Sequence, residues 1–117
     1  MDFQPTNFPI ENEFPKLIRD KIPDIIALRG AKANTQTLAS DEEYLMFLLK
    51  KMLEEATELQ HSEEVGNMQE ELADVLEIIQ AIVKLKNWTM EEIVTVQKEK
   101  REKNGGFEKR ILMLSKE

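Results

Sequence analysis

Residues 41–87 read DEEYLMFLLKKMLEEATELQHSEEVGNMQEELADVLEIIQAIVKLKN and decide the fold. Glutamate, leucine, lysine, methionine and alanine, all good helix formers, dominate this stretch. Apolar residues recur every three or four positions on both sides of Gly66 and Asn67, which is typical of amphipathic helices rather than strands. The stretch therefore predicts two long antiparallel helices, over about 41–62 and 67–87, joined by a short turn.

The flanking sequence predicts two shorter helices. Pro23 suits the first turn of a short helix over 23–29. Capping boxes, in which a serine or threonine precedes a glutamate by three residues, begin at Ser40 and Thr89, and the second opens a helix to about 103. One chain offers few helices to cover two long apolar stripes. We therefore expect an all-α helical bundle, built on the long antiparallel hairpin and completed by oligomerisation.

The two ends of the sequence differ from its middle. Three prolines deny residues 1–15 a helix, so this N-terminal extension is expected to be a loose arm or a strap whose phenylalanines pack on a neighbouring subunit. Residues 16–117 are expected to form one domain. Its last part, FEKRILML at 107–114, is expected to form a short strand or another helical turn.

Composition excludes several classes of protein. Lys and Arg number 16 against 23 Asp and Glu, a net charge of -7, which disfavours binding to nucleic acid. Cysteine is absent, which removes disulfide scaffolds and thiolate metal sites. The sequence shows no apolar run near the roughly 20 residues of a membrane span and no signal peptide. We expect a soluble, cytoplasmic protein with no membrane partner.

Two carboxylates lie in the apolar arc of the second long helix. With about 100° per residue, Glu71 falls among Val75 and Ile78, and Asp74 lies roughly 60° from Glu71, inside the same arc. An isolated buried carboxylate costs several kcal/mol or binds a proton. Two arrangements would compensate the charge of this pair. A buried cation such as Lys51 could form a salt bridge with it, or the two carboxylates could be ligands of a metal ion.

Three further carboxylates lie on the first long helix. Glu54, Glu55 and Glu58 fall within a sector of about 100° beside its core stripe, and taken alone they suggest a solvated face. Folding the hairpin brings them to a similar depth as Glu71 and Asp74. Taken together, the five acids favour a divalent metal site, and hard oxygen ligands without histidine or cysteine suit Mg²⁺ or Mn²⁺.

The sequence also contains E-x-x-H, the half-motif of di-iron helical bundles, at Glu58 to His61. Such a centre needs two of these motifs, and His61 is the single histidine, so only a symmetric dimer could supply the second. We expect His61 instead on the surface near the end of its helix, where the dipole stabilises it.

Mg²⁺ held by carboxylates usually takes substrate phosphates as its remaining ligands. The protein must then provide positive side chains for the rest of the phosphate chain. The candidates are Arg19, Lys21, Lys98, Lys100, Arg101 and Lys103. The last four are equally explained by the preference of cations for helix C-termini. The aromatic side chains that could stack on a base, or else belong to the core, are Tyr44, Phe47, Trp88 and Phe107.

The acidic pattern, E-E-x-x-E at 54–58 followed by E-x-x-D at 71–74, resembles the signature of all-α nucleoside triphosphate pyrophosphohydrolases. This MazG-type superfamily includes phosphoribosyl-ATP pyrophosphohydrolase and the dimeric dUTPases. KLIRDKIPDII at 16–26 and NGGFEKRI at 104–111 resemble a branch of small MazG-like proteins labelled phosphoribosyl-ATP pyrophosphohydrolase-like. The similarity covers roughly 16–112.

The resemblance implies Mg²⁺-dependent cleavage of a nucleoside triphosphate between its α- and β-phosphates, in house-cleaning of non-standard or surplus nucleotides. It implies a homodimer or homotetramer. Glu55, Glu58, Glu71 and Asp74 match the metal ligands, and Glu54 matches the acid that orients or deprotonates the attacking water. Two alternatives remain, a phosphoribosyl-ATP pyrophosphohydrolase of histidine synthesis and a non-catalytic helical dimerisation or regulatory module.

Overall fold

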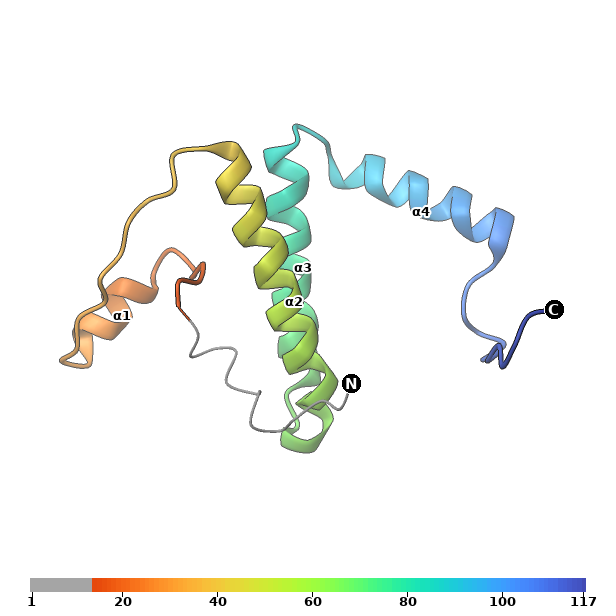
Figure 1. Ribbon diagram of the computed structural model, residues 1–117, viewed down its shortest axis with the longest axis horizontal. Coiled ribbons are helices and arrows are strands. Elements are labelled where there is room, and N and C mark those ends of the chain that lie inside the picture. The colour runs from red at the N-terminus through yellow and green to blue at the C-terminus, as the bar shows by residue number, and fades with distance from the viewer. Residues whose placement is uncertain (1–13) are drawn as a thin grey trace.

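A computed structural model describes residues 14–117 of the chain (Figure 1). Within that range the regular secondary structure is all helix, with no strand, which confirms the predicted all-α class. The helices, in chain order, are α1 (Ile22–Leu28), α2 (Asp41–Val65), α3 (Met68–Leu85) and α4 (Met90–Asn104). The arm or strap expected at the N-terminus lies outside the described residues, except for its last two.

Side chains cap two of the helices as predicted. Ser40 accepts a hydrogen bond of 3.0 Å from the backbone N–H of Glu43, which satisfies one of the unpaired donors at the start of α2. At the start of α4 the capping box is complete. Thr89 accepts a hydrogen bond from the N–H of Glu92, and the Glu92 carboxylate accepts one from the N–H of Thr89.

The long helices end where the backbone turns left-handed. Gly66, with a φ of 75°, adopts the left-handed conformation that ends α2. The helix therefore reaches Val65, three residues past its predicted end at 62. Asn87, with a φ of 61°, follows the end of α3. After α4 the described chain makes one hydrogen-bonded turn, in which the N–H of Arg110 donates to the carbonyl of Phe107 over 3.0 Å. Of the two structures expected in this tail, the strand does not form.

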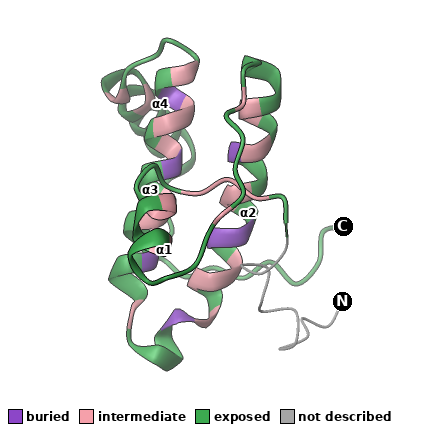
Figure 2. Cartoon of the chain, turned by 90° about the vertical axis from the view of Figure 1, so that its left-hand side faces the viewer, coloured by how far each residue is buried: buried purple, intermediate pink, exposed green. Residues whose placement is uncertain are grey.

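α2 and α3 lie side by side and run in opposite directions, and they are the only extensively packed pair of helices in residues 14–117 (Figure 1). Their contact buries Leu48 of α2 and Ile78 and Val83 of α3. Figure 2 shows the buried positions on these two helices. No helix within the described range is long and apolar enough to cross a lipid bilayer.

One side of the α2–α3 pair is apolar and uncovered. We call it the apolar face, and its residues are Met46, Leu49 and Leu53 of α2 and Leu72 and Leu76 of α3. Leu53 is 67% exposed and Leu72 is 51% exposed. At about 100° per residue, both sets are rotated from the contact between the helices in the same sense. Because the helices are antiparallel, this rotation places both sets on one side of the pair.

Candidate metal centre

All five carboxylates that the sequence singles out converge where α2 meets α3. They form two groups of three, Glu54 with Glu55 and Glu58, and Glu55 with Glu71 and Asp74. Within each group, one carboxylate oxygen from every residue lies within 4.8 Å of the others. Glu55 belongs to both groups, so the two groups adjoin.

Three of these carboxylates are removed from solvent. Glu54, Glu55 and Glu71 are only 5%, 6% and 8% exposed. The solvated face that the α2 glutamates would suggest on their own is therefore wrong for Glu54 and Glu55. The Asp74 side chain is 33% exposed and marks the open edge of the cluster. Buried charges in this number need a compensating cation or protons.

Burial raises the proton affinity of two carboxylates in the cluster, Glu55 and Glu71. Burial raises the pKa of Glu55 from 4.5 to about 8, with the charges of Glu58 and Asp74 adding to this rise and that of Lys51 opposing it. Burial also raises the pKa of Glu71, and the charges of Glu58 and Asp74 act in the same direction. Protons therefore compensate part of the charge at neutral pH when no metal ion is bound.

One buried oxygen of the cluster has no hydrogen-bond partner among residues 14–117. Glu71 accepts a hydrogen bond of 3.2 Å at Oε2 from Nδ2 of Asn67. Its Oε1 is buried and accepts no hydrogen bond within the described residues. Such orphaned buried acceptors are rare in folded proteins, and a bound cation is one of the causes that explain them. The residues present thus fit a divalent metal ion with oxygen ligands.

Asn67 is a site residue that the sequence reasoning used only as a turn former. Its position four residues before Glu71, one helical turn, is the signal that could have identified it, because an amide and a carboxylate at this spacing can form a hydrogen bond. The Asn67 side chain fixes the direction of the Glu71 carboxylate. Its own Oδ1 is buried without a hydrogen-bond partner in the described part of the chain.

Two cations contact the rim of the cluster. Nζ of Lys51 lies 2.8 Å from Oε2 of Glu54, and Nη2 of Arg19 lies 2.6 Å from Oδ1 of Asp74. The salt-bridge interpretation therefore holds for Asp74, which pairs with Arg19, but Lys51 pairs with Glu54 of its own helix and not with Glu71 or Asp74. Glu55 and Glu71, the deep members, have no lysine or arginine at ion-pair distance in residues 14–117.

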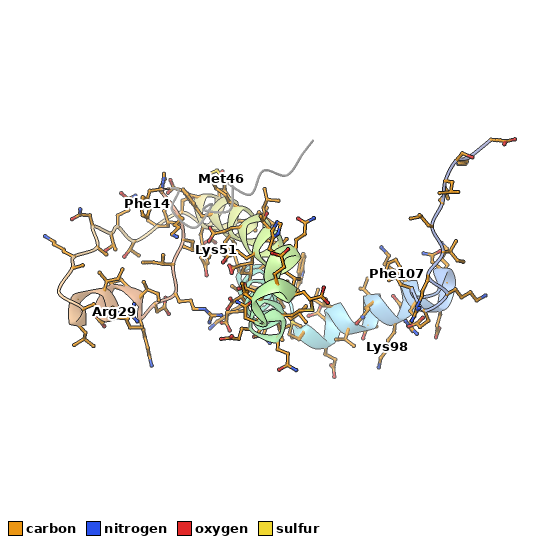
Figure 3. The ribbon with its side chains drawn as sticks, turned by 90° about the horizontal axis from the view of Figure 1, so that it is seen from below. Phe14, Arg29, Met46, Lys51, Lys98 and Phe107 are labelled. Carbon is orange, nitrogen blue, oxygen red and sulfur yellow. The ribbon has the colours of Figure 1, made fainter. Side chains whose placement is uncertain are left out.

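The remaining phosphate candidates lie away from the carboxylates. Four of them, Lys98, Lys100, Arg101 and Lys103, are exposed on α4. This helix extends away from the α2–α3 pair, and Figure 3 shows Lys98 far from Lys51. Arg101 donates a hydrogen bond of 2.8 Å to Glu108. Lys21 is exposed at the start of α1. Of the six cations predicted to bind phosphate, all within the described residues, only Arg19 reaches the cluster within one chain.

His61 does not join the site. It is partly buried rather than on the surface, because α2 continues beyond it. Neither carboxylate group includes it, although histidines can serve as ligands in such groups. The di-iron interpretation of the E-x-x-H sequence therefore receives no support from the described residues.

Comparison with known proteins gives no match: no protein-family model, no curated protein and no solved structure matches this chain. The likeness to MazG-type pyrophosphohydrolases therefore rests on the acidic pattern and its two flanking motifs.

Proposed function

We propose that this protein is a Mg²⁺-dependent nucleoside triphosphate pyrophosphohydrolase. Water would attack the α-phosphorus, the bond from that phosphorus to the bridging oxygen would break, and pyrophosphate would leave with the electron pair. The observation that supports this most directly is the pair of carboxylate groups sharing Glu55, beside an unpartnered buried oxygen of Glu71. An oxygen-only donor set suits Mg²⁺ or Mn²⁺ rather than softer metals.

We assign the five carboxylates two roles, metal binding and activation of the attacking water. Glu55, Glu58, Glu71 and Asp74 would hold the metal, and Glu54 would orient the attacking water and accept its proton. Mg²⁺, when bound, neutralises phosphate charge and lowers the pKa of a water ligand. Glu54 is suited to its role because Lys51 holds one of its oxygens at 2.8 Å, which fixes the direction of the carboxylate.

The burial of the acids also weighs against a purely structural role. A non-catalytic dimerisation module would have no use for Glu55 and Glu71, since apolar replacements of buried charged groups are often neutral or stabilising. The same chemistry would serve a phosphoribosyl-ATP pyrophosphohydrolase, but no described side chain selects that substrate. Clearance of non-standard or surplus nucleotides in the cytoplasm is the role we propose.

We further propose that a second copy completes the helical bundle. The chain exposes 10424 Å². A compact monomer of 13.6 kDa would expose about 6,600 Å². The difference exceeds the roughly 800 Å² that each partner buries in a standard interface. The apolar face, rotated away from Asp74 and Glu58, can pack on its own copy and leave the carboxylates accessible, in a homodimer or as one interface of a homotetramer.

A pyrophosphate-release screen tests the proposed activity. Purified wild type and the Glu71→Gln variant are assayed over natural and modified nucleoside triphosphates, with and without Mg²⁺ or Mn²⁺. We expect release of pyrophosphate and a monophosphate from at least one nucleotide by the wild type, only with metal, and none by the variant. If the wild type turns over no nucleotide with either metal, the enzyme proposal fails and the dimerisation module is favoured.

A further inference from the structure

A small cavity lies next to the carboxylates, between the segment before α1 and the middle of α2. Its volume is about 30 Å³, and three lysines, Lys16, Lys50 and Lys51, line it together with Phe47 and Glu54. We call these three lysines and their surroundings the lysine pocket. Glu54 belongs both to this pocket and to one carboxylate group, so the two sites adjoin.

The charges of the lysine pocket are only partly compensated. Lys51 pairs with Glu54 at 2.8 Å. Lys16 and Lys50 form no ion pair with any described residue. Their ammonium groups instead lie 5.7 Å from the ring centre of Phe14 and 5.8 Å from that of Phe47. Two cations that form no ion pair with a described residue thus line the same cavity as Glu54, one of the five acids.

This arrangement differs from the other cationic and concave surfaces of the described chain. α4 carries three lysines as well, but it extends away from the α2–α3 pair that holds the carboxylates, and Lys98 lies far from Lys51 (Figures 1 and 3). A second hollow, beside the turn between α2 and α3, is lined by Glu63 and Glu70 and by no cation. Among these surfaces of residues 14–117, only the lysine pocket combines cations that form no ion pair with a lining residue, Glu54, of the carboxylate cluster.

We propose that Lys16 and Lys50 bind the pyrophosphate portion of the substrate, while the carboxylates hold the cation at the phosphate under attack. This assignment rests on the proposed function and adds a phosphate subsite to it. As the bond to the bridging oxygen breaks, negative charge grows on the departing pyrophosphate. Ammonium groups already in position stabilise that charge more strongly than they stabilise the bound substrate.

The test compares two variants with the same loss of charge. One carries Lys16→Gln and Lys50→Gln, and the control carries Lys84→Gln and Lys86→Gln at exposed positions on and just after α3. Binding of inorganic pyrophosphate with Mg²⁺ is measured by calorimetry, and the rise in melting temperature with Mg²⁺ alone is measured separately. We expect at least tenfold weaker binding in the first variant, since two hydrogen bonds to a charged group are lost. The control should bind like the wild type, and the Mg²⁺ response should be the same in all three proteins.

Equal pyrophosphate affinity in the first variant and the wild type would overturn the subsite, as would an equal loss in the control. A wild type that responds to Mg²⁺ but binds no pyrophosphate would overturn the subsite and leave the metal centre intact. Lysine-dependent pyrophosphate binding without any Mg²⁺ response would overturn the metal centre and leave the subsite. Should the double variant fold poorly, Lys50→Gln alone decides, because Lys50 is exposed.

Discussion

Arg19 donates a hydrogen bond of 2.6 Å to Asp74, which joins the segment before α1 to α3 across 55 positions of sequence. The Arg19 side chain is 55% exposed and that of Asp74 is 33% exposed, so the ion pair contributes at most about 1 kcal/mol to stability. The sequence predicts a phosphate ligand at the first position and a metal ligand at the second. A guanidinium paired with Asp74 and a metal ion bound by Asp74 would compete for the same carboxylate.

Replacing Arg19 by glutamine should therefore separate metal binding from substrate binding. We expect Arg19→Gln to bind Mg²⁺ at least as tightly as the wild type, since the competing guanidinium is gone, and to show a raised KM for the nucleotide. Calorimetry with Mg²⁺ and steady-state kinetics measure the two effects. Arg29→Gln, at the exposed end of α1, is the control. Weaker Mg²⁺ binding in Arg19→Gln would mean that Arg19 positions Asp74 instead of competing for it.

The metal-free protein should lose stability as pH rises. Burial raises the pKa of Glu55 from 4.5 to about 8, so the folded state keeps a proton that the unfolded state releases. Below about 4.5 both states are protonated and this effect is absent. Between about 4.5 and 8 each rise in pH favours unfolding, and the raised pKa of Glu71 acts in the same direction.

Melting temperatures from pH 5 to 8.5 check this sign, in a chelator and again with saturating Mg²⁺. We expect the decline in the chelator only, because a divalent cation compensates the ionised carboxylates and binds more tightly as Glu55 loses its proton. Glu55→Gln should flatten the decline. A melting temperature that rises with pH in the chelator would show that Glu55 ionises easily in the folded protein.

The two carboxylates of α3 can be tested against an exposed neighbour on the same helix. Glu71→Gln and Asp74→Asn should each abolish both the rise in melting temperature with Mg²⁺ and the pyrophosphate release. The amide that replaces Glu71 removes a repelling charge, so the metal-free protein should keep its stability or gain some. Glu77→Gln, whose side chain is 60% exposed, should leave both readouts unchanged. Activity retained in both ligand variants would exclude this site.

Helical periodicity predicted the burial of Glu71 in α3, but it overestimated that of Asp74 and missed that of Glu54 in α2. The arc of apolar residues around Glu71 predicts its burial, and the structure confirms it at 8% exposure. Glu54 lies outside the apolar stripe of α2, yet it is as buried as Glu55. The cover comes from the segment around Lys16, which packs over α2 at the lysine pocket. A contact between such distant parts of the chain leaves no trace in the spacing of either.

The capping residues and glycines placed the helix ends well because they act within one turn. The position of α4 could not be derived in the same way. Its charged and apolar residues are all exposed or half-buried, so its sequence has no stripe that specifies a partner surface within the chain. Leu49 of α2 likewise fits the core stripe by spacing, but no other part of the described chain covers it, and it is 53% exposed in a single copy.

Self-association through the apolar face can be tested with Leu53→Glu combined with Leu72→Glu. Both leucines are at least half exposed in the single chain, so a charge there should disturb the monomer little but prevent burial against a second copy. Sedimentation at micromolar concentration should show an oligomer for the wild type and a monomer for the double variant. Lys109→Glu, on the exposed tail, serves as the control. An unchanged oligomer in the double variant would assign assembly to another surface, and a monomeric wild type would contradict assembly itself.

The division of roles within the α2 acids leads to the sharpest kinetic expectation. Glu54 belongs to only one of the two carboxylate groups, whereas Glu55 belongs to both. Lys51 holds Oε2 of Glu54 at 2.8 Å, which leaves its other oxygen to face the cluster. A carboxylate fixed in this way at the edge of a metal centre can hold a water by hydrogen bond and accept its proton without being a ligand itself.

Glu54→Gln should therefore lower kcat by 10²–10⁴-fold, roughly 3–5 kcal/mol of barrier, while Mg²⁺ still binds. Glu55→Gln and Glu58→Gln should weaken Mg²⁺ binding itself, because each removes a charged ligand. Titration calorimetry with Mg²⁺, run beside steady-state kinetics on the same preparations, separates the two kinds of defect. Lys51→Gln should resemble a milder Glu54→Gln, since the carboxylate stays but loses its fixed direction. If Glu54→Gln loses Mg²⁺ as fully as Glu58→Gln does, then Glu54 is a metal ligand and the proton must be accepted elsewhere.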